Sequence, residues 1–78
     1  MKELVEYIAT SLVDDPSEVR IQEFQRGPVI NLKLHVAKED MGRIIGKNGR
    51  VANSIRLLLR VAAARQGKKV SLDVEEPR

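Results

Sequence analysis

Two glycines three residues apart are the clearest candidate for binding chemistry in this sequence. Gly46 and Gly49 enclose Lys47 and Asn48, and Arg50 follows directly. Glycine lets a backbone approach a ligand closely and adopt angles that other residues avoid. If a helix begins after Gly49, its free amides and its dipole attract anions, and Lys47 and Arg50 add positive charge beside them. These features suit a loop that contacts a sugar-phosphate backbone.

Other phosphate-binding loops do not fit this spacing. A Walker A loop has the pattern GxxxxGK[ST], whereas Gly42 and Gly46 lie one residue too close together and Lys47 is followed by asparagine. A dinucleotide-binding fingerprint, GxGxxG, needs a glycine at position 44, which is isoleucine. A simple turn between two helices uses glycines in the same way, and for the motif taken alone it is the favoured interpretation.

Positive charge is concentrated around and after this loop. The net charge is only +3, yet residues 38–69 hold nine lysines and arginines against two acidic residues. Such a field favours a polyanion partner, although a basic helix can also be no more than a solvated surface. Because Tyr7 and Phe24 are the only aromatic residues, backbone amides, aliphatic side chains, arginine and lysine would make most contacts with RNA.

The composition excludes several other classes of function. The chain has no cysteine, which rules out disulfides, cysteine-held iron–sulfur clusters and thiolate zinc sites. Its single histidine, His35, is expected on a strand surface and is assigned no role. Glu39 and Asp40, the acids nearest the loop in sequence, are explained by a helix start. We therefore predict no catalytic residue, metal or cofactor, and a non-catalytic protein.

Neither a membrane span nor a signal peptide is predicted. The longest apolar run, residues 61–64, is far shorter than the roughly 20 residues that a span needs. The first residues carry acids and no apolar block. The expected location is the cytoplasm, with no membrane partner.

Six elements are predicted to position the loop. They are a helix over residues 2–13, strands around 19–24 and 30–36, a short helix over 38–45, a longer helix over 50–65 and a strand over 70–74. Glu23 and Phe24 interrupt the alternation of the first strand, which suggests a bulge. The last two strands are joined by helices, a connection long enough to make them parallel. The order α-β-β-α-α-β predicts an α+β fold in which a three-stranded mixed sheet has its helices packed on one face.

The long helix has two candidate apolar surfaces. Its predicted buried stripe is Val51, Ala52, Ile55, Leu58, Leu59 and Ala62. A second apolar strip consists of Leu57, Val61 and Ala64. That strip either packs against another helix of the domain or makes a dimer contact.

The arginines are assigned to phosphate contact or to solvated surface according to their distance from the loop in the sequence. Arg43 and Arg50 flank it and are predicted to contact phosphate. For Arg56, Arg60 and Arg65, further along the long helix, a solvated surface is favoured over a role in binding.

Residues 44–49, Ile-Ile-Gly-Lys-Asn-Gly, resemble the signature of the KH domain, in which an aliphatic pair precedes GxxG. The element order matches the type II, prokaryotic arrangement of that fold. The resemblance covers essentially the whole chain, so residues 1–78 are interpreted as one KH domain. In length and simplicity the chain is similar to the stand-alone bacterial RNA-binding proteins of the KhpA (YlqC) family. One departure is Ala52, where the general signature has a larger aliphatic residue, and it predicts a shallower groove floor.

The resemblance implies a site that holds about four nucleotides of single-stranded RNA. The residues assigned to RNA binding, from the motif, its basic flanks and the loop before the last strand, are Arg43, Ile44, Ile45, Gly46, Lys47, Asn48, Gly49, Arg50, Lys68 and Lys69. The corresponding role is that of an RNA chaperone or a post-transcriptional regulator.

The same resemblance implies protein partners. This chain is similar to proteins that self-associate, and members of the family also pair with a larger KH-containing protein of the KhpB/Jag type. A homodimer or such a heteromeric pair would use the strip of Leu57, Val61 and Ala64. The alternative function is a protein-interaction module that keeps the KH fold and acts mainly through these contacts.

Overall fold

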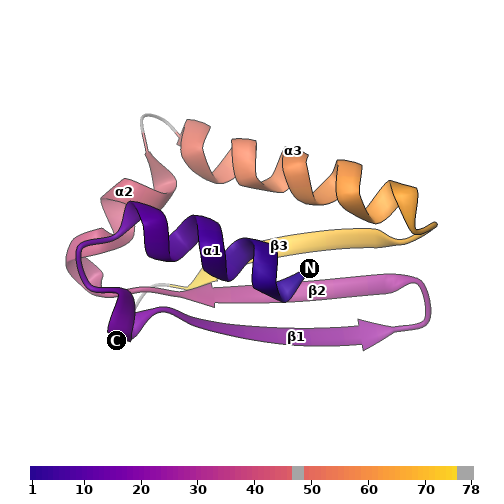
Figure 1. The fold of residues 1–78 in the computed structure, drawn as a ribbon, viewed down its shortest axis with the longest axis horizontal. Helices are drawn as coiled ribbons and strands as arrows, with labels where there is room; N and C mark the ends of the chain where they lie inside the picture. Colours follow the sequence, from indigo (N-terminus) through magenta and orange to yellow (C-terminus); the bar gives the residue numbers. More distant parts are fainter. Residues whose placement is uncertain (47–48, 76–78) are drawn as a thin grey trace.

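The computed structural model describes residues 1–46 and 49–75 and shows the six predicted elements in the predicted order (Figure 1). They are α1 (Lys2–Leu12), β1 (Arg20–Arg26), β2 (Val29–His35), α2 (Met41–Ile45), α3 (Arg50–Arg65) and β3 (Lys69–Glu75). Single turns of 3-10 helix, Pro16–Glu18 and Lys38–Asp40, precede β1 and α2. Residues 38–40, predicted as part of the short helix, therefore form a separate turn.

β1 and β2 form an antiparallel hairpin whose pairing is continuous over residues 20–26 and 29–35. The bulge predicted at Glu23 and Phe24 is wrong. Glu23 lies opposite the buried Leu32, on the helix side of the sheet, and is nevertheless exposed. Every residue of β1 after Ile21 is exposed, so a polar residue is tolerated on this side further along the strand.

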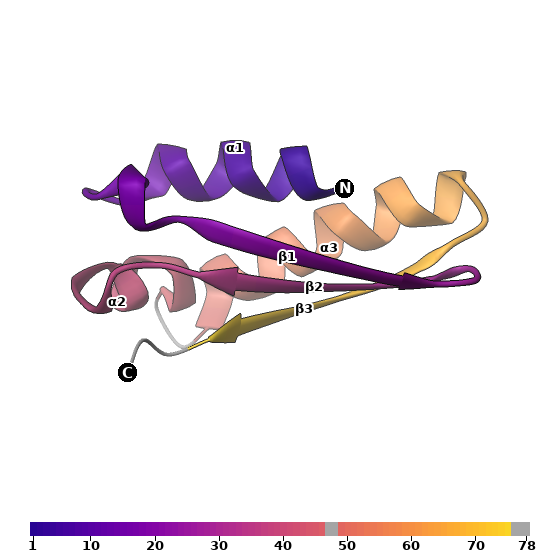
Figure 2. The same ribbon diagram turned by 90° about the horizontal axis from the view of Figure 1, so that it is seen from below.

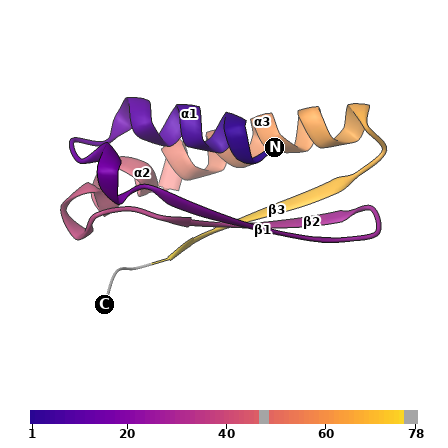
Figure 3. The same ribbon diagram turned by 60° about the horizontal axis from the view of Figure 1, so that its bottom comes forward.

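β3 lies beside β2 and runs parallel to it, in the sheet order β1-β2-β3. α2 and α3 make the connection between these two strands. Seen from below, the strands lie in front of α3 (Figure 2), and α1, α2 and α3 lie on one face of the sheet (Figure 3). The predicted fold class, a three-stranded mixed sheet with helices packed on one face, is confirmed.

The hydrophobic core lies between the sheet and the helices. Its buried members are Val5, Ala9, Ile30, Leu32, Leu34, Val36, Ile44, Ile55, Leu59 and Leu72. β2 contributes most of the strand residues because it is the central strand and faces the helices along its whole length. Among the described residues, no helix has the length and apolar character that crossing a membrane requires.

α3 buries a narrower stripe than predicted. Its buried residues are Ala52, Ile55, Leu59 and Ala63. Leu58, predicted as core, is 54% exposed, because the sheet covers only the side chains that point directly at it. Leu57 and Val61 are 58% and 51% exposed. The alternative in which these two residues pack inside the domain is therefore wrong.

Candidate nucleic-acid interface

Gly46 ends α2 in a conformation that requires glycine. Its φ of 64° and ψ of −173° lie in a region that is open essentially only to glycine. A Cβ atom on Gly46 would also lie 2.7 Å from Cβ of Val51, which belongs to the first turn of α3 and packs against the core. The first glycine of the motif therefore allows α2 to stop abruptly and α3 to begin against it.

Gly49 precedes α3 in the left-handed conformation, with φ 81° and ψ 8°. A side chain there would have room, since the atom nearest to its Cβ is Nδ2 of Asn53 at 3.8 Å. Neither a capping side chain nor an acidic residue occupies the described start of α3, so its amides form a positive helix end. Lys47 and Asn48 lie outside the described residues, and their assignment to the RNA site stays a prediction.

The residues beside the loop divide between core and surface. Ile44 is fully buried and anchors α2, whereas Ile45 is 40% exposed at the end of α2. Ile45 is thus the member of the aliphatic pair that a ligand can touch. Arg50 is exposed on the first turn of α3, where its charge adds to that of the helix end.

Arg43 is held by acidic partners. Its Nη2 donates to Oδ2 of Asp14 at 2.7 Å, and its Nε lies 3.5 Å from Oδ1 of Asp40. The Asp40 carboxylate is 2% exposed and accepts the backbone N–H groups of Asp14 at 3.0 Å and of Asp15 at 3.1 Å. This cluster ties the segment after α1 to the start of α2. Because two carboxylates offset its charge, Arg43 is primarily a structural residue here, and its contact with phosphate stays a prediction.

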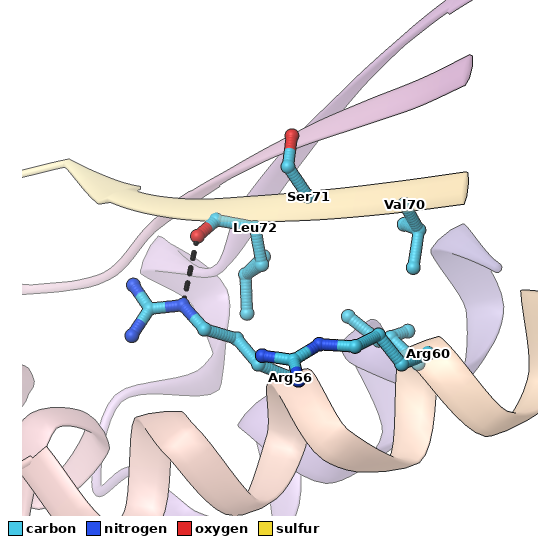
Figure 4. Close-up of a pocket in the computed structure, with 6 residues that line it drawn as sticks. Arg56, Arg60, Val70, Ser71 and Leu72 are labelled. Atoms are coloured by element: carbon cyan, nitrogen blue, oxygen red, sulfur yellow. Dashed lines mark hydrogen bonds between the residues drawn. The ribbon is translucent and has the colours of Figure 1, made fainter.

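A groove runs between α3 and the free edge of β3. A hollow of about 170 Å3 is lined there by Arg56, Leu59, Arg60, Val70, Ser71 and Leu72 (Figure 4). Arg56 crosses the hollow, where its Nε donates to the carbonyl oxygen of Leu72 at 3.1 Å and its Nη1 donates to Oδ1 of Asn53 at 3.1 Å. The solvated surface favoured for Arg56 is therefore wrong, since its side chain is half-buried against β3.

The edge of β3 offers backbone groups to this groove. β3 pairs with β2 on one side only, and alternate residues of a parallel strand direct both backbone groups away from the partner. The bond from Arg56 to the carbonyl of Leu72 shows that Leu72 is one of the outward residues, and Val70 has the same orientation. Donors and acceptors of the main chain thus lie next to two arginines.

The loop between α3 and β3 closes the far end of the groove. A second hollow is lined there by Arg60, Ala63, Ala64, Lys68, Lys69 and Val70, so Arg60 and Val70 belong to both hollows. The loop is fixed at its base, because Lys68 N–H donates to the Ala63 carbonyl at 2.9 Å and Lys69 N–H donates to the Pro28 carbonyl at 2.8 Å. The structure therefore brings the predicted Lys68 and Lys69 to the groove, together with Ala64 of the predicted dimer strip.

Comparison with known proteins shows the family of this chain. The model of the family described as KhpA/KhpB, KH domain matches residues 2–74. The chain belongs to the KhpA/KhpB KH-domain family. This confirms the predicted membership, and the family is a non-catalytic kind of protein, as the sequence predicted.

Several KhpA proteins are similar to this KH domain over nearly their full length. RNA-binding protein KhpA of Clostridium perfringens is 49% identical over 74 residues, which are 95% of this chain and 99% of that protein. RNA-binding protein KhpA of Chlamydia trachomatis is 49% identical over 78 residues, 100% of both chains. RNA-binding protein KhpA of Chlamydia pneumoniae is 50% identical over 76 residues, 97% of each chain.

Two solved structures of Era share the fold of this KhpA/KhpB KH domain. Aquifex aeolicus Era bound to GDP and AlF4⁻ superposes with a TM-score of 0.66 at 22% identity. Era in complex with MgGDPNP and nucleotides 1506–1542 of 16S ribosomal RNA superposes with a TM-score of 0.61 at 23% identity. Each match covers 94% of this chain and 28% of the Era chain. The likeness concerns the fold.

Sequence reasoning missed one wall of the groove in this KhpA/KhpB KH domain. Arg56 and Arg60 are four residues apart, so they lie on one side of a helix, and Arg56 borders the buried stripe. Those signals were present in the sequence. The sequence does not show the orientation of β3, which brings the Leu72 carbonyl within reach of Arg56. Among residues 1–46 and 49–75, no three side chains of the metal-binding types converge on one point.

Proposed function

We propose that this chain is a single-stranded RNA-binding protein without catalytic activity, working as one KH domain over residues 1–78. The groove between α3 and β3 carries the proposal, because Arg56, Arg60 and Lys68 line it beside an open strand edge. Family membership supports it, since relatives 45% to 50% identical are named RNA-binding proteins.

The GxxG loop, in this proposal, clamps the RNA backbone. A phosphate lies at the start of α3, where the helix amides, Lys47 and Arg50 supply donors and positive charge. The close packing of Gly46 on Val51 supports this placement, since a larger residue would push the loop away from the helix end. Ile45, exposed at the end of α2, gives an apolar surface to the first base.

The following nucleotides run along α3 toward Lys68. The 16 residues of α3 span about 24 Å at 1.5 Å per residue, a length that suits the roughly four nucleotides of a KH site. Base edges pair with the outward backbone groups of Val70 and Leu72. The Leu72 carbonyl has two lone pairs, so a base can share it with Arg56 or displace that side chain toward a phosphate.

The biological role that we propose is that of an RNA chaperone or a post-transcriptional regulator. A shallow groove that reads few bases by main-chain contacts binds many sequences, each with modest affinity. Two such domains on one RNA raise the overall affinity by avidity. Permissive, reversible binding of this kind suits a protein that acts on many transcripts.

The outer side of α3 is the surface that we propose for a protein partner. Leu57, Leu58 and Val61 are each more than half exposed there, and Ala64 is exposed beside them. The partner is a second copy of the chain or a larger KH-containing protein of the KhpB/Jag type. The same exposure favours the second candidate function, an interaction module in which RNA binding is incidental. The basic groove favours RNA binding as the main function.

Titration of a short single-stranded RNA pool, followed by fluorescence anisotropy, tests the clamp. The variant carries Lys47→Asp and Asn48→Asp, and a matched control carries Lys2→Asp and Ser11→Asp on the exposed side of α1, which changes the charge equally. Circular dichroism confirms that both are folded, and two salt concentrations separate specific loss from general screening.

The expected result is salt-sensitive binding that the control keeps and the loop variant loses. Equal binding by all three proteins would replace the clamp with a diffuse basic surface. If the wild type binds no RNA at all, the interaction module becomes the better interpretation of this fold.

A further inference from the structure

The face of the sheet opposite the helices is a second organised surface. The pairing register shows which side chains point away from the helices. They form four cross-strand rows, each with one residue from β1, β2 and β3. The rows are Arg26, Val29 and Lys69; Phe24, Asn31 and Ser71; Gln22, Lys33 and Asp73; and Arg20, His35 and Glu75. All described helices pack on the other face (Figure 3), so these side chains meet solvent.

Charge on this face is divided between the strands. The eight residues that β1 and β2 contribute to this face include Arg20, Arg26 and Lys33 and no acidic residue. The two acids of the face, Asp73 and Glu75, lie at the far end of β3. The two rows nearest the α3–β3 loop carry Arg26 and Lys69 and no acid. This half of the face is complementary to a polyanion.

Phe24 lies on the edge strand β1, in the second row of that positive half. Its side chain is 53% exposed, and the Lys33 ammonium lies 5.9 Å from the centre of its ring. Its register partner Asn31 accepts a hydrogen bond at Oδ1 from the Ser71 hydroxyl at 2.6 Å, which holds the amide beside the ring. An exposed aromatic ring flanked by cations and an oriented amide is the arrangement that stacks nucleobases on a sheet.

The contacts of Lys33 do not block this use of the ring. Its salt bridge with Glu75 is 3.6 Å long, and both side chains are more than two-fifths exposed. Exposed ion pairs and exposed cation–π contacts are weaker than the stacking of a base on an aromatic ring. A base can therefore displace the ammonium from Phe24, and the freed charge then meets a neighbouring phosphate.

The open face is continuous with the end of the groove. Lys69 lines the groove end with Lys68 and Arg60, and it also begins the row that contains Val29 and Arg26. Rows lie about 7 Å apart along a strand and neighbouring strands about 4.8 Å apart, so Phe24 on β1 is one row and two strands away from Lys69 on β3. An RNA strand that leaves the groove at the loop reaches the phenyl ring without crossing an acidic residue.

We propose that the open face of the sheet is a second contact surface for single-stranded RNA, on which a base stacks on Phe24 while Arg26, Lys33 and Lys69 hold the flanking phosphates. The proposal rests on the proposed function, because the strand arrives from the groove. It extends the binding site beyond the roughly four nucleotides that one groove accommodates.

RNA length separates the two surfaces. We would titrate the full chain with single strands of four and of ten nucleotides, using the wild type, Phe24→Ala and the control Tyr7→Ala, which removes the other exposed aromatic residue on α1. The expected result is that Phe24→Ala weakens binding of the longer strand about five- to tenfold and leaves the shorter one unchanged. Tyr7→Ala should bind both strands like the wild type.

Tryptophan fluorescence gives a direct readout of stacking, because the chain contains no tryptophan. Emission of Phe24→Trp should be quenched by the ten-nucleotide strand and not by the four-nucleotide strand, while Tyr7→Trp stays unquenched by either. Equal affinity of Phe24→Ala and the wild type for the longer strand, with unquenched emission of the Phe24→Trp variant, would overturn the proposal while leaving the groove intact. Equal weakening of both lengths, or a change in sedimentation without a change in RNA affinity, would also overturn it. Failure of the wild type to bind either length would overturn both proposals.

Discussion

Arg56 on α3 donates a hydrogen bond from Nε to the carbonyl oxygen of Leu72 on β3, 3.1 Å away across the groove. A second bond, from its Nη1 to Asn53, ties the guanidinium group to the helix it comes from. One side chain thus connects the helix wall of the groove with its strand wall, and it places a permanent charge above an outward-facing strand edge.

Arg56→Ala is expected to weaken RNA binding about tenfold, because the groove loses both a cation and the group that fixes its width. Arg56→Lys keeps the charge but loses the fork of donors, so its affinity for RNA should lie between those of the wild type and Arg56→Ala. Arg65→Ala is the matched control, because Arg65 is exposed at the end of α3 and lines neither hollow. Anisotropy titrations at several salt concentrations measure this effect. A loss with Arg65→Ala as large as with Arg56→Ala would show that only the overall field matters.

Gly46→Ala should destabilise the fold by about 2–4 kcal/mol, because it combines an unfavourable backbone conformation with a collision against Val51. Gly42→Ala is the contrasting change, since Gly42 is helical and a Cβ there meets open space. It should stabilise the protein by up to about 1 kcal/mol. Urea denaturation of both variants compares the free energies of unfolding. Similar values for the two would contradict the crowding seen at Gly46.

Asp40→Asn should lower the free energy of unfolding by about 1–3 kcal/mol, because a buried acceptor of two backbone N–H groups loses its charge and one of its acceptor oxygens. Glu39→Gln makes the same chemical change at an exposed neighbour and should have little effect. Thermal unfolding followed by circular dichroism distinguishes the two. An unaltered melting temperature for Asp40→Asn would mean that this cluster does not stabilise the fold.

Val61→Glu should abolish self-association if the outer side of α3 is the dimer interface, because it places a charge in the middle of the exposed strip. Tyr7→Glu, which replaces a more exposed apolar side chain on α1, should leave the association unchanged. Sedimentation velocity over micromolar concentrations provides the measurement. A monomeric wild type throughout that range would end the homodimer proposal and direct the search toward a heteromeric partner.

Much of this architecture could be predicted from local patterns in the sequence. Alternation over residues 30–36 identified the central strand, and the glycines at 46 and 49 marked the break between α2 and α3, since both signals arise from neighbouring residues. Gly67, the second residue after the end of α3, likewise adopts a φ of 68°, a conformation that favours glycine. Patterns of this kind do not depend on the tertiary contacts that form later.

The errors share a physical cause, because each depends on tertiary contacts that local sequence patterns do not reveal. Leu58 has the helical spacing of a core residue, but it is 54% exposed, because no neighbouring element covers that side of α3. Glu23 breaks the alternation in a part of β1 that stays exposed, where a polar residue is tolerated on either face. Arg56 could not be assigned to the groove without knowing that the Leu72 carbonyl faces α3.

The parallel pairing of β2 and β3 also decides how quickly the chain can fold. Asn31 and Ser71 are register partners 40 positions apart, whereas β1 and β2 meet across a two-residue turn. Closing a long loop costs chain entropy before any of its contacts form. The hairpin and α3 are therefore expected to appear early, and the arrival of β3 at the edge of β2 is expected to be the rate-limiting step. The strand edge that we assign to RNA would thus be the last part of the domain to take shape.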